Sequence, residues 1–305
     1  MTASNPPRDE SLYRPGGPPP RGAHPDSHLD STAQLMNRIT SQLGSQLSLV
    51  SLNGTRRPAA PALVLVAHGS RDPRALSTVR TLMERIRELR PHLSVRLGHI
   101  ELNEPLLPDT LASLDSGQAV LVPLLLSRGY HVKHDIPEAA AAAPNVATRV
   151  AAPLGPHPLL VETLYARLVE AGWRTRMSDT ARRASAVVLA AAGSRDPDAA
   201  VDTRRTAQLL AERLGVPVVP AYASAASPTV PAALRALAAR GRHRVAVASY
   251  FTAPGRFATQ CAEAAPWIAA EPLGDHPAMA RLVLHRYDQA VATPEPSPER
   301  ALASA

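Results

Sequence analysis

Three side chains that can bind metals or move protons each follow a predicted strand in the first part of the chain. They are His68, Glu101 and His131, after the strand-like segments at 63–67, 94–100 and 119–126. Two imidazoles and a carboxylate suit a divalent metal ion with open coordination positions. The carboxylate can also take up a proton as a general base. The pattern therefore predicts a site that handles a divalent metal and removes a proton.

The chain contains two copies of the same series of motifs. The segment LVAHGSRDP at 65–73 returns as LAAAGSRDP at 189–197, and APLGPHP at 152–158 returns as EPLGDHP at 271–277. A repeated order of motifs indicates two copies of one structural unit. We therefore expect two similar domains, at 60–172 and 184–292, joined by an Arg-rich linker at 173–183.

The second copy lacks all three candidate residues. Its aligned positions hold Ala192, Ser224 and Phe257, whereas the flanking GSRDP and PLGxHP motifs persist. Loss of all three together is expected if they act as one unit, because independent structural roles would have left one of them behind. The first copy is therefore the expected catalytic domain, and the second is a degenerate domain of the same kind.

Each copy alternates strand-like and helix-like segments. The continuous apolar run at 63–67 is typical of a parallel strand that is buried on both faces. Asp72 and Pro73 then provide an N-cap and a first-turn proline, and Asp135 is expected to cap a later helix that contains Pro137. The alternation predicts an α/β fold of two tandem domains, each a parallel sheet flanked by helices. Ligands bind such sheets beyond the carboxyl ends of the strands, where the three candidates fall.

Composition excludes several classes of protein. The 305 residues carry a net charge of +7, and acidic and basic residues interleave without a basic block, which argues against a nucleic-acid partner. Cys261 is the single cysteine, as expected in a reducing compartment, and no apolar run of about 18 residues could span a membrane. We expect a cytoplasmic protein with a disordered Pro-rich tail at 1–58 and a C-terminal tail at 293–305.

The motifs around the candidate residues resemble those of a known family. AHGSR at 67–71, ELNEP at 101–105 and GYHVKHDIP at 129–137 are similar in order and spacing to those of the CbiX/SirB-type sirohydrochlorin chelatases, the class II tetrapyrrole chelatases. The resemblance implies a lyase that inserts Co²⁺ or Fe²⁺ into sirohydrochlorin without ATP, in siroheme or cobalamin biosynthesis. It also implies sirohydrochlorin and a divalent metal ion as substrates, with no permanently bound cofactor.

The resemblance also assigns expected roles to individual residues. His68 and His131 match the family's metal-handling histidines, and Glu101 matches its acidic residue. His99 lies two residues before Glu101, on the same face of its strand, and departs from a family pattern that is more often apolar there.

The second copy is expected to form the other wall of a substrate cleft, because ligand pockets occur preferentially between domains. Arg256 aligns with Tyr130, beside the metal-handling position. We therefore expect Arg256 to face the cleft and to pair with a carboxylate of the substrate. A chain that ends near Gly172 is then expected to bind metal but to bind sirohydrochlorin poorly.

Two other functions fit parts of the pattern. A non-catalytic carrier of tetrapyrroles or metals would also need ligand residues, although retention of all three candidates argues for turnover. A histidine phosphatase also has a histidine after its first strand. Such an enzyme carries arginine directly before that histidine, where this chain has Ala67.

Several other polar residues are expected to have structural roles. His157 and His276 recur in both copies, so we expect them to make hydrogen bonds at helix starts. Ser70 persists in the second copy and Glu104 precedes a proline, so both are expected in turns. Cys261 is expected to be buried on a helix.

Overall fold

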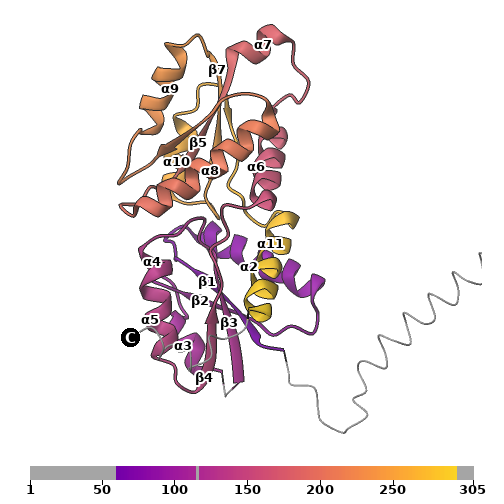
Figure 1. Cartoon of the computed structure of the whole chain (residues 1–305), viewed down its shortest axis with the longest axis vertical. Coiled ribbons are helices and arrows are strands. Elements are labelled where there is room, and N and C mark those ends of the chain that lie inside the picture. The colour runs from indigo at the N-terminus through magenta and orange to yellow at the C-terminus, as the bar shows by residue number, and fades with distance from the viewer. Residues whose placement is uncertain (1–59, 115–116, 294–305) are drawn as a thin grey trace, which may run out of the picture. The chain divides into compact units, whose positions relative to one another are not determined.

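Two four-stranded parallel sheets form the framework of the chain (Figure 1). The computed structural model describes residues 60–114 and 117–293, and its residues from Ala60 onward belong to one compact unit. The predicted tail at 1–58 lies outside the described residues, as does the predicted C-terminal tail apart from Thr293. The α/β fold with two tandem parallel sheets is confirmed.

The first sheet has the strand order β2-β1-β3-β4 and the second has the order β6-β5-β7-β8. The first four strands are β1 (Ala62–Ala67), β2 (Val95–His99), β3 (Gly117–Pro123) and β4 (Val146–Val150). The other four are β5 (Ser185–Ala191), β6 (Val218–Tyr222), β7 (Arg244–Tyr250) and β8 (Ile268–Ala269). We call residues 60–172 the first repeat and residues 184–292 the second repeat.

Helices cover both faces of each sheet, which is why the central strands are apolar throughout. In the first repeat they are α2 (Pro73–Leu89), α3 (Leu107–Ala112), α4 (Tyr130–Lys133), α5 (Asp135–Ala141) and α6 (Pro158–Glu170). Helix α7 (Asp179–Ala184) lies in the linker, and the second repeat has α8 (Pro197–Leu214), α9 (Val230–Ala238), α10 (Arg256–Glu263) and α11 (Pro277–Ala292). Alternate residues of β1 face opposite layers: Leu63 and Leu65 belong to one core cluster, Val64 and Val66 to another.

Helix starts follow the sequence signals with one exception. The Asp72 carboxylate accepts a hydrogen bond from the backbone N–H of Arg74 at 2.9 Å, as predicted for the N-cap of α2. The predicted capping role of Asp135 is wrong, because Asp135 is the first residue of α5 and His134 occupies the N-cap position. The Asp135 carboxylate contacts the His131 ring instead of capping the helix.

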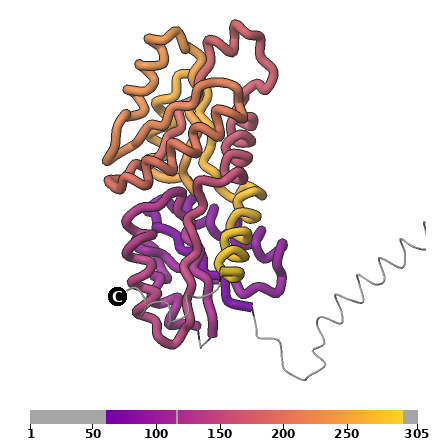
Figure 2. The backbone as a smooth tube through the Cα atoms, in the orientation of Figure 1, coloured from indigo at the N-terminus to yellow at the C-terminus, as the bar shows by residue number. Residues whose placement is uncertain are grey.

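The last helix of each repeat packs on the sheet of the other repeat. Helix α6 packs against α8 and β7, whereas α11 packs against α2, β3 and β4. Figure 2 shows the exchange, with the yellow α11 lying beside the indigo and purple chain of the first repeat. One core cluster consequently extends from Leu63 in β1 through Leu282 in α11 to Leu189 in β5. The two repeats therefore share one hydrophobic core cluster, and each repeat has a second cluster of its own.

Matching arginines fix the exchanged helices. Arg167 on α6 donates to the carbonyl of Leu273 at 3.2 Å, and Arg286 on α11 donates to the carbonyl of Leu154 at 3.2 Å. Both carbonyls lie in the repeated PLG motif. The repeated sequence thus makes the same hydrogen bond twice, each time across the boundary between the repeats.

The repeated histidines cap the exchanged helices. Nδ1 of His157 accepts from the backbone N–H of Leu159 at 3.1 Å, and Nδ1 of His276 accepts from that of Ala278 at 3.2 Å. Their predicted role at helix starts is confirmed. Burial, with smaller contributions from Arg286 and His285, lowers the pKa of His157 from 6.5 to about 4.

Acid is expected to destabilise the protein through His157. Because the folded pKa is about 4 and the unfolded value is 6.5, the unfolded chain binds more protons between these values, so stability falls as the pH falls through this window. The shift sets an upper bound of roughly 3 kcal/mol, which screening of a partly exposed ring reduces to about 1–2 kcal/mol. His157→Asn keeps a capping side chain and removes the titration. We expect its thermal midpoint to fall less than that of the wild type between pH 6.5 and 4.

The exposed His243 provides the control for this comparison. His243→Asn should leave the pH dependence of the midpoint unchanged. Equal acid sensitivity in His157→Asn and the wild type would show that another group carries the effect.

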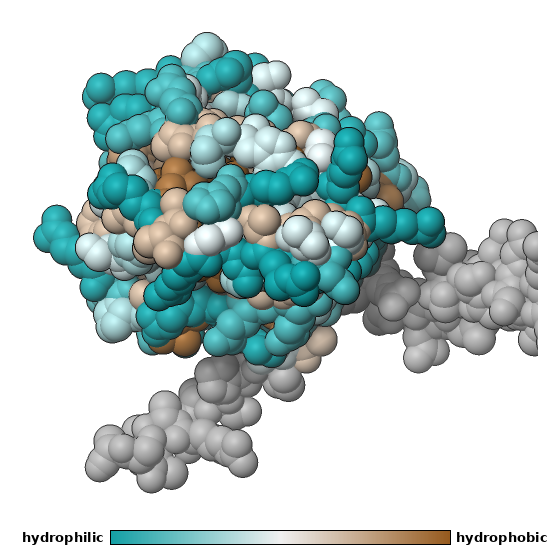
Figure 3. Space-filling model, turned by 90° about the horizontal axis from the view of Figure 1, so that it is seen from above, coloured by the Kyte–Doolittle hydropathy of each residue, from teal (hydrophilic) through white to brown (hydrophobic). Residues whose placement is uncertain are grey.

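The surface seen in Figure 3 is mostly hydrophilic, with hydrophobic residues confined to small separate areas. Among the helices of the described chain, none has the length and apolar content needed to cross a membrane.

Candidate functional site

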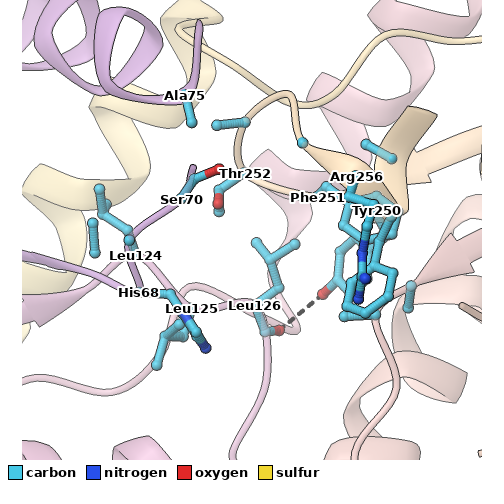
Figure 4. Close-up of a pocket in the computed structure, with 18 of the residues that line it drawn as sticks. His68, Ser70, Ala75, Leu124, Leu125, Leu126, Tyr250, Phe251, Thr252 and Arg256 are labelled. Carbon is cyan, nitrogen blue, oxygen red and sulfur yellow. Dashed lines mark hydrogen bonds between the residues drawn. The ribbon is translucent and has the colours of Figure 1, made fainter. Parts of the chain in front are cut away.

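A large cleft lies where the carboxyl ends of both sheets meet. Its volume is about 1540 Å³, and residues of both repeats line it. Figure 4 shows His68, Ser70, Leu124 and Leu125 of the first repeat on one side of the cavity and Tyr250, Phe251 and Arg256 of the second repeat on the other, with Leu126 between them. The expectation that the second repeat forms the other wall of the cleft agrees with this arrangement.

The three candidate residues come together on the wall formed by the first repeat. Nδ1 of His68 lies 3.4 Å from Oε1 of Glu101, and the ring centroids of His68 and His131 are 4.8 Å apart, edge to face. The side chains of His68 and Glu101 are about half exposed, at 44% and 53%, so both can reach a molecule in the cleft. The structure therefore brings the predicted residues together, while their roles as ligands and base remain predictions.

Backbone geometry at Gly69 fixes the position of His68. Gly69 has a φ of +103°, and a Cβ atom there would lie 1.8 Å from the carbonyl oxygen of Glu101. The Glu101 backbone N–H in turn donates to the carbonyl of His68 at 3.0 Å. Only glycine allows the chain to pass this close, so the glycine after His68 is needed to bring the imidazole and the carboxylate together.

Asp135 orients the second histidine, a role that sequence reasoning missed. Its Oδ2 contacts Nδ1 of His131, four residues earlier, across the break between α4 and α5. A carboxylate on one ring nitrogen fixes the tautomer of a histidine and leaves the other nitrogen available to a metal. The four-residue separation of a histidine and an aspartate was the signal that could have revealed this pair.

The other polar residues near the site have structural contacts. Oγ of Ser70 accepts from the Asp72 backbone N–H at 3.1 Å, and Glu104 accepts from that of Leu106 at 3.2 Å, as predicted for turn residues. His99 is 2% exposed, and its Nδ1 lies 3.1 Å from the carbonyl oxygen of Pro105. Cys261 is buried on α10, as predicted, and burial raises the pKa of its thiol.

The equivalent positions of the second repeat carry no comparable chemistry. Oγ of Ser224, at the place of Glu101, donates to the carbonyl of Ala192 at 3.0 Å. Phe257, at the place of His131, lies under the guanidinium of Arg256, 4.7 Å from the ring centroid. Arg256 lines the cleft, so its predicted location is confirmed, and its binding role remains a prediction. Arg71 lines the cleft from the first repeat.

Polar contacts join the two walls of the cleft. The buried hydroxyl of Tyr250 donates to the carbonyl of Leu126 at 2.9 Å, the bond dashed in Figure 4. Burial raises the pKa of Tyr250 well above its usual range, so the hydroxyl remains a donor. A hydrogen bond from Lys133 lowers the pKa of Asp196 below its usual value. These contacts tie the segment that follows β3 to the second repeat.

The candidate residues lie along one wall of the cleft. Among residues 60–114 and 117–293, no group of three or more His, Cys, Asp or Glu side chains is arranged to hold a metal ion by itself. His68 and His131 present their rings to the cleft with Glu101 beside them. The arrangement offers two imidazoles and a carboxylate along one side of a cavity and leaves the other side to a second molecule.

Comparison with known proteins relates both repeats to one family. The sequence model of the CbiX family matches residues 62–171 and again 186–290. The sirohydrochlorin ferrochelatase of Bacillus subtilis (strain 168) is 32% identical over 178 residues, which cover 55% of this chain and 64% of the relative. The sirohydrochlorin cobaltochelatase of Methanococcus aeolicus is 39% identical over 80 residues, which cover 25% of this chain and 56% of the relative. The chain thus spans less than two thirds of each of these two relatives.

A solved structure shares the fold. The sirohydrochlorin chelatase SirB from Bacillus subtilis subspecies spizizenii, in complex with cobalt, has a TM-score of 0.61 at 23% identity, over 77% of this chain and 97% of that chain. The two matches to the family model coincide with the two repeats and together take in most of the described residues. The chain therefore belongs to the CbiX family.

Proposed function

We propose that this protein is a sirohydrochlorin chelatase that inserts Co²⁺ or Fe²⁺ into the tetrapyrrole without ATP. The observation that carries the proposal is the meeting of His68, Glu101 and His131 on one wall of a cleft that both repeats enclose. Membership of the CbiX family supports it, as do the relatives that are a sirohydrochlorin ferrochelatase and a sirohydrochlorin cobaltochelatase.

The two imidazoles deliver the metal. A divalent ion must shed water before it can enter a macrocycle, and neutral imidazoles hold such an ion while water leaves. Asp135 on one nitrogen of His131 keeps the other nitrogen directed to the ion. Because His68 and His131 line the cleft, an ion held between them can pass to a substrate bound there.

Glu101 removes protons from the substrate. Metal insertion replaces two pyrrole N–H protons, so a base must lie beside the delivery point. The Glu101 carboxylate is 3.4 Å from His68 and half exposed to the cleft. It can accept a pyrrole proton directly and release it to solvent, or it can serve as a third ligand during transfer.

The cleft suits a large anionic plate. Its volume of about 1540 Å³ exceeds the roughly 300–1,000 Å³ of pockets that hold drug-sized ligands. Sirohydrochlorin carries carboxylates around its whole rim. Arg71 on one wall and Arg256 on the other can pair with them, so that the macrocycle is held with one face toward the histidines.

A turnover assay tests the proposal. Under anaerobic conditions, sirohydrochlorin is mixed with Co²⁺ or Fe²⁺ and catalytic amounts of protein, and the metallated product is followed by absorbance. We expect many product molecules per protein, formed faster than in protein-free controls. Formation of no more than one equivalent would contradict the chelatase proposal and favour the carrier alternative.

Arg256→Ala is expected to weaken substrate binding more than catalysis. Loss of one charged hydrogen-bond donor costs about 1.5–3 kcal/mol, so the KM for sirohydrochlorin should rise by about tenfold or more while kcat changes little. The control is Arg195→Ala, which removes an exposed arginine outside the residues that line the cleft. An unchanged KM in Arg256→Ala would remove this residue from the binding site.

A further inference from the structure

Two cationic residues flank His131, and both pair with the second repeat. Asp202 accepts hydrogen bonds from the backbone N–H of Arg128 at 2.9 Å and from its guanidinium at 2.8 Å. Lys133, the one lysine of the chain, lies 2.7 Å from Asp196 and 2.9 Å from Asp198. We call residues 127–134 the His131 segment, and Asp196, Asp198 and Asp202 the acidic face of α8.

Asp202 is the buried member of the acidic face. Its side chain is 4% exposed, and its carboxylate accepts hydrogen bonds from three groups of Arg128. A carboxylate is rarely buried to this degree unless a cation compensates it. Asp202 has no role in the mechanism proposed above, although its carboxylate binds Arg128 in the segment that carries His131.

Two of the three residues of the acidic face have no acidic counterpart at the equivalent helix of the first repeat. Helices α2 and α8 share the Asp-Pro start, but Arg74 and Thr78 occupy in α2 the positions of Asp198 and Asp202 in α8. Arg74 also pairs with the capping aspartate of its own turn, at 2.7 Å. The start of α2 is therefore neutralised locally, whereas the start of α8 is neutralised by the His131 segment.

The cationic residues are missing from the equivalent segment of the second repeat. Pro254 and Thr259 occupy there the positions of Arg128 and Lys133. The two segments otherwise approach the opposite repeat alike. A Cβ atom on Gly129 would lie 3.8 Å from Oγ of Ser194 in the second repeat. A Cβ atom on Gly255 would lie 3.7 Å from Oγ of Ser70 in the first repeat. The glycine–serine approach is thus common to both repeats, whereas the charges of Arg128 and Lys133 occur only in the first repeat.

We propose that the acidic face of α8 positions His131 for metal transfer, acting through Lys133 and Arg128. Asp196, Asp198 and Asp202 are then positioning residues, and the inference rests on the proposed chelatase function. Helix α4 has only four residues, too few to be stable alone, so its geometry depends on such external ties. The degenerate repeat thereby contributes to catalysis without any chemically active group of its own.

Positioning matters here because the imidazole must meet both an ion and a macrocycle. A misplacement of about 1 Å at a reacting group can cost 100-fold in rate. The Asp135 contact orients the ring within the His131 segment, but it cannot fix where the segment lies in the cleft. The ion pairs to α8 supply that second constraint.

Charge reversal at Asp198 tests the proposal. Asp198→Arg introduces the residue that α2 tolerates at the same helical position, and it places a like charge against Lys133. Asp198→Glu is the conservative variant, because it keeps the negative charge beside Lys133. The control is Arg281→Glu, which reverses the charge in another pair across the repeats, with Glu162 at 2.7 Å, away from the cleft.

Two measurements apply to every variant. The first is kcat and KM for metal insertion, and the second is amide hydrogen exchange of the His131 segment, which requires no activity. We expect Asp198→Arg to lower kcat about tenfold and to speed exchange at Lys133 and His134 by a similar factor, with an unchanged thermal midpoint. Asp198→Glu should keep both values within about threefold of those of the wild type, and Arg281→Glu should match the wild type.

The outcomes separate this inference from the function on which it rests. Wild-type kcat and wild-type exchange in Asp198→Arg would overturn the positioning role, as would an equal loss of kcat in Asp198→Glu. If the wild type itself does not insert metal, the chelatase proposal fails, while the exchange data still decide whether α8 holds the segment. Asp202→Thr is the stronger perturbation, because it removes the buried partner of Arg128. If Asp202→Thr does not fold, Asp198→Arg still tests the proposal.

Discussion

His131→Ala is expected to lower kcat for metal insertion by roughly 100-fold or more, and His68→Ala should do the same. Each substitution removes a group that acts directly on the reacting ion, and such groups contribute about 10²–10⁴ in rate. Both histidines lie at the rim of the sheet with exposed side chains, at 44% for His68 and 34% for His131. The cost in folding free energy should therefore stay within about 0.5 kcal/mol.

The measurements are steady-state kinetics of metal insertion, titration calorimetry with Co²⁺, and thermal midpoints. His134→Ala is the matched control. It removes a neighbouring histidine whose ring stacks on Tyr130, 4.6 Å between centroids, and which is not among the residues lining the cleft. Near-wild-type turnover in a folded His68 or His131 variant would show that metal transfer occurs elsewhere.

The strands could be predicted because parallel strands buried on both faces leave continuous apolar runs. The run at 63–67 corresponds to β1, at Ala62–Ala67. The run at 119–126 extends beyond β3, which ends at Pro123, because proline has no N–H to continue the ladder. Leu124–Leu126 then leave the sheet and line the cleft. Hydrophobicity alone cannot distinguish a residue buried in a sheet from one that faces a ligand cavity.

The exchange of α6 and α11 could not be predicted from periodicity. An apolar helix face shows that a helix is packed, but the face does not specify which sheet covers it. The two repeats have similar sheets, so either partner would bury the same side chains. The contacts that select the partner, such as Arg167 with Leu273, join residues that lie far apart in the sequence.

The candidate site was recovered from strand ends, because parallel strands place their carboxyl termini at one edge. The missed residues act through others rather than at the reacting centre. Aspartate is a favoured capping residue, so the sequence predicts a cap at Asp135. In the structure the Asp135 carboxylate contacts His131 and does not cap the helix. The acidic face of α8 belongs to the copy without candidate residues, so only an aligned comparison of the two copies, position by position, could have indicated it.

A chain that ends at Gly172 is expected not to fold, in contrast to the expectation from sequence that it would still bind metal. Such a chain lacks α11, which covers one face of the first sheet by packing against α2 and β3. Five large side chains of α11 are at least 93% buried: Met279, Leu282, Val283, Leu284 and Tyr287. At about 1.5–3 kcal/mol for each, their burial contributes roughly 8–15 kcal/mol, which is comparable to the whole stability of a typical domain.

Circular dichroism and thermal unfolding of the 60–172 fragment measure this directly, with the 60–293 chain as the reference. Mixing the fragment with a second one spanning 173–293 should restore the fold, because α6 and α11 can then each find the opposite sheet. A folded 60–172 fragment with a cooperative transition of its own, and Co²⁺ affinity equal to that of the longer chain, would contradict the prediction. Each repeat would then be an independent domain that folds without the shared core. The exchanged helices argue for the opposite result, since each sheet borrows one of its covering layers from the other repeat.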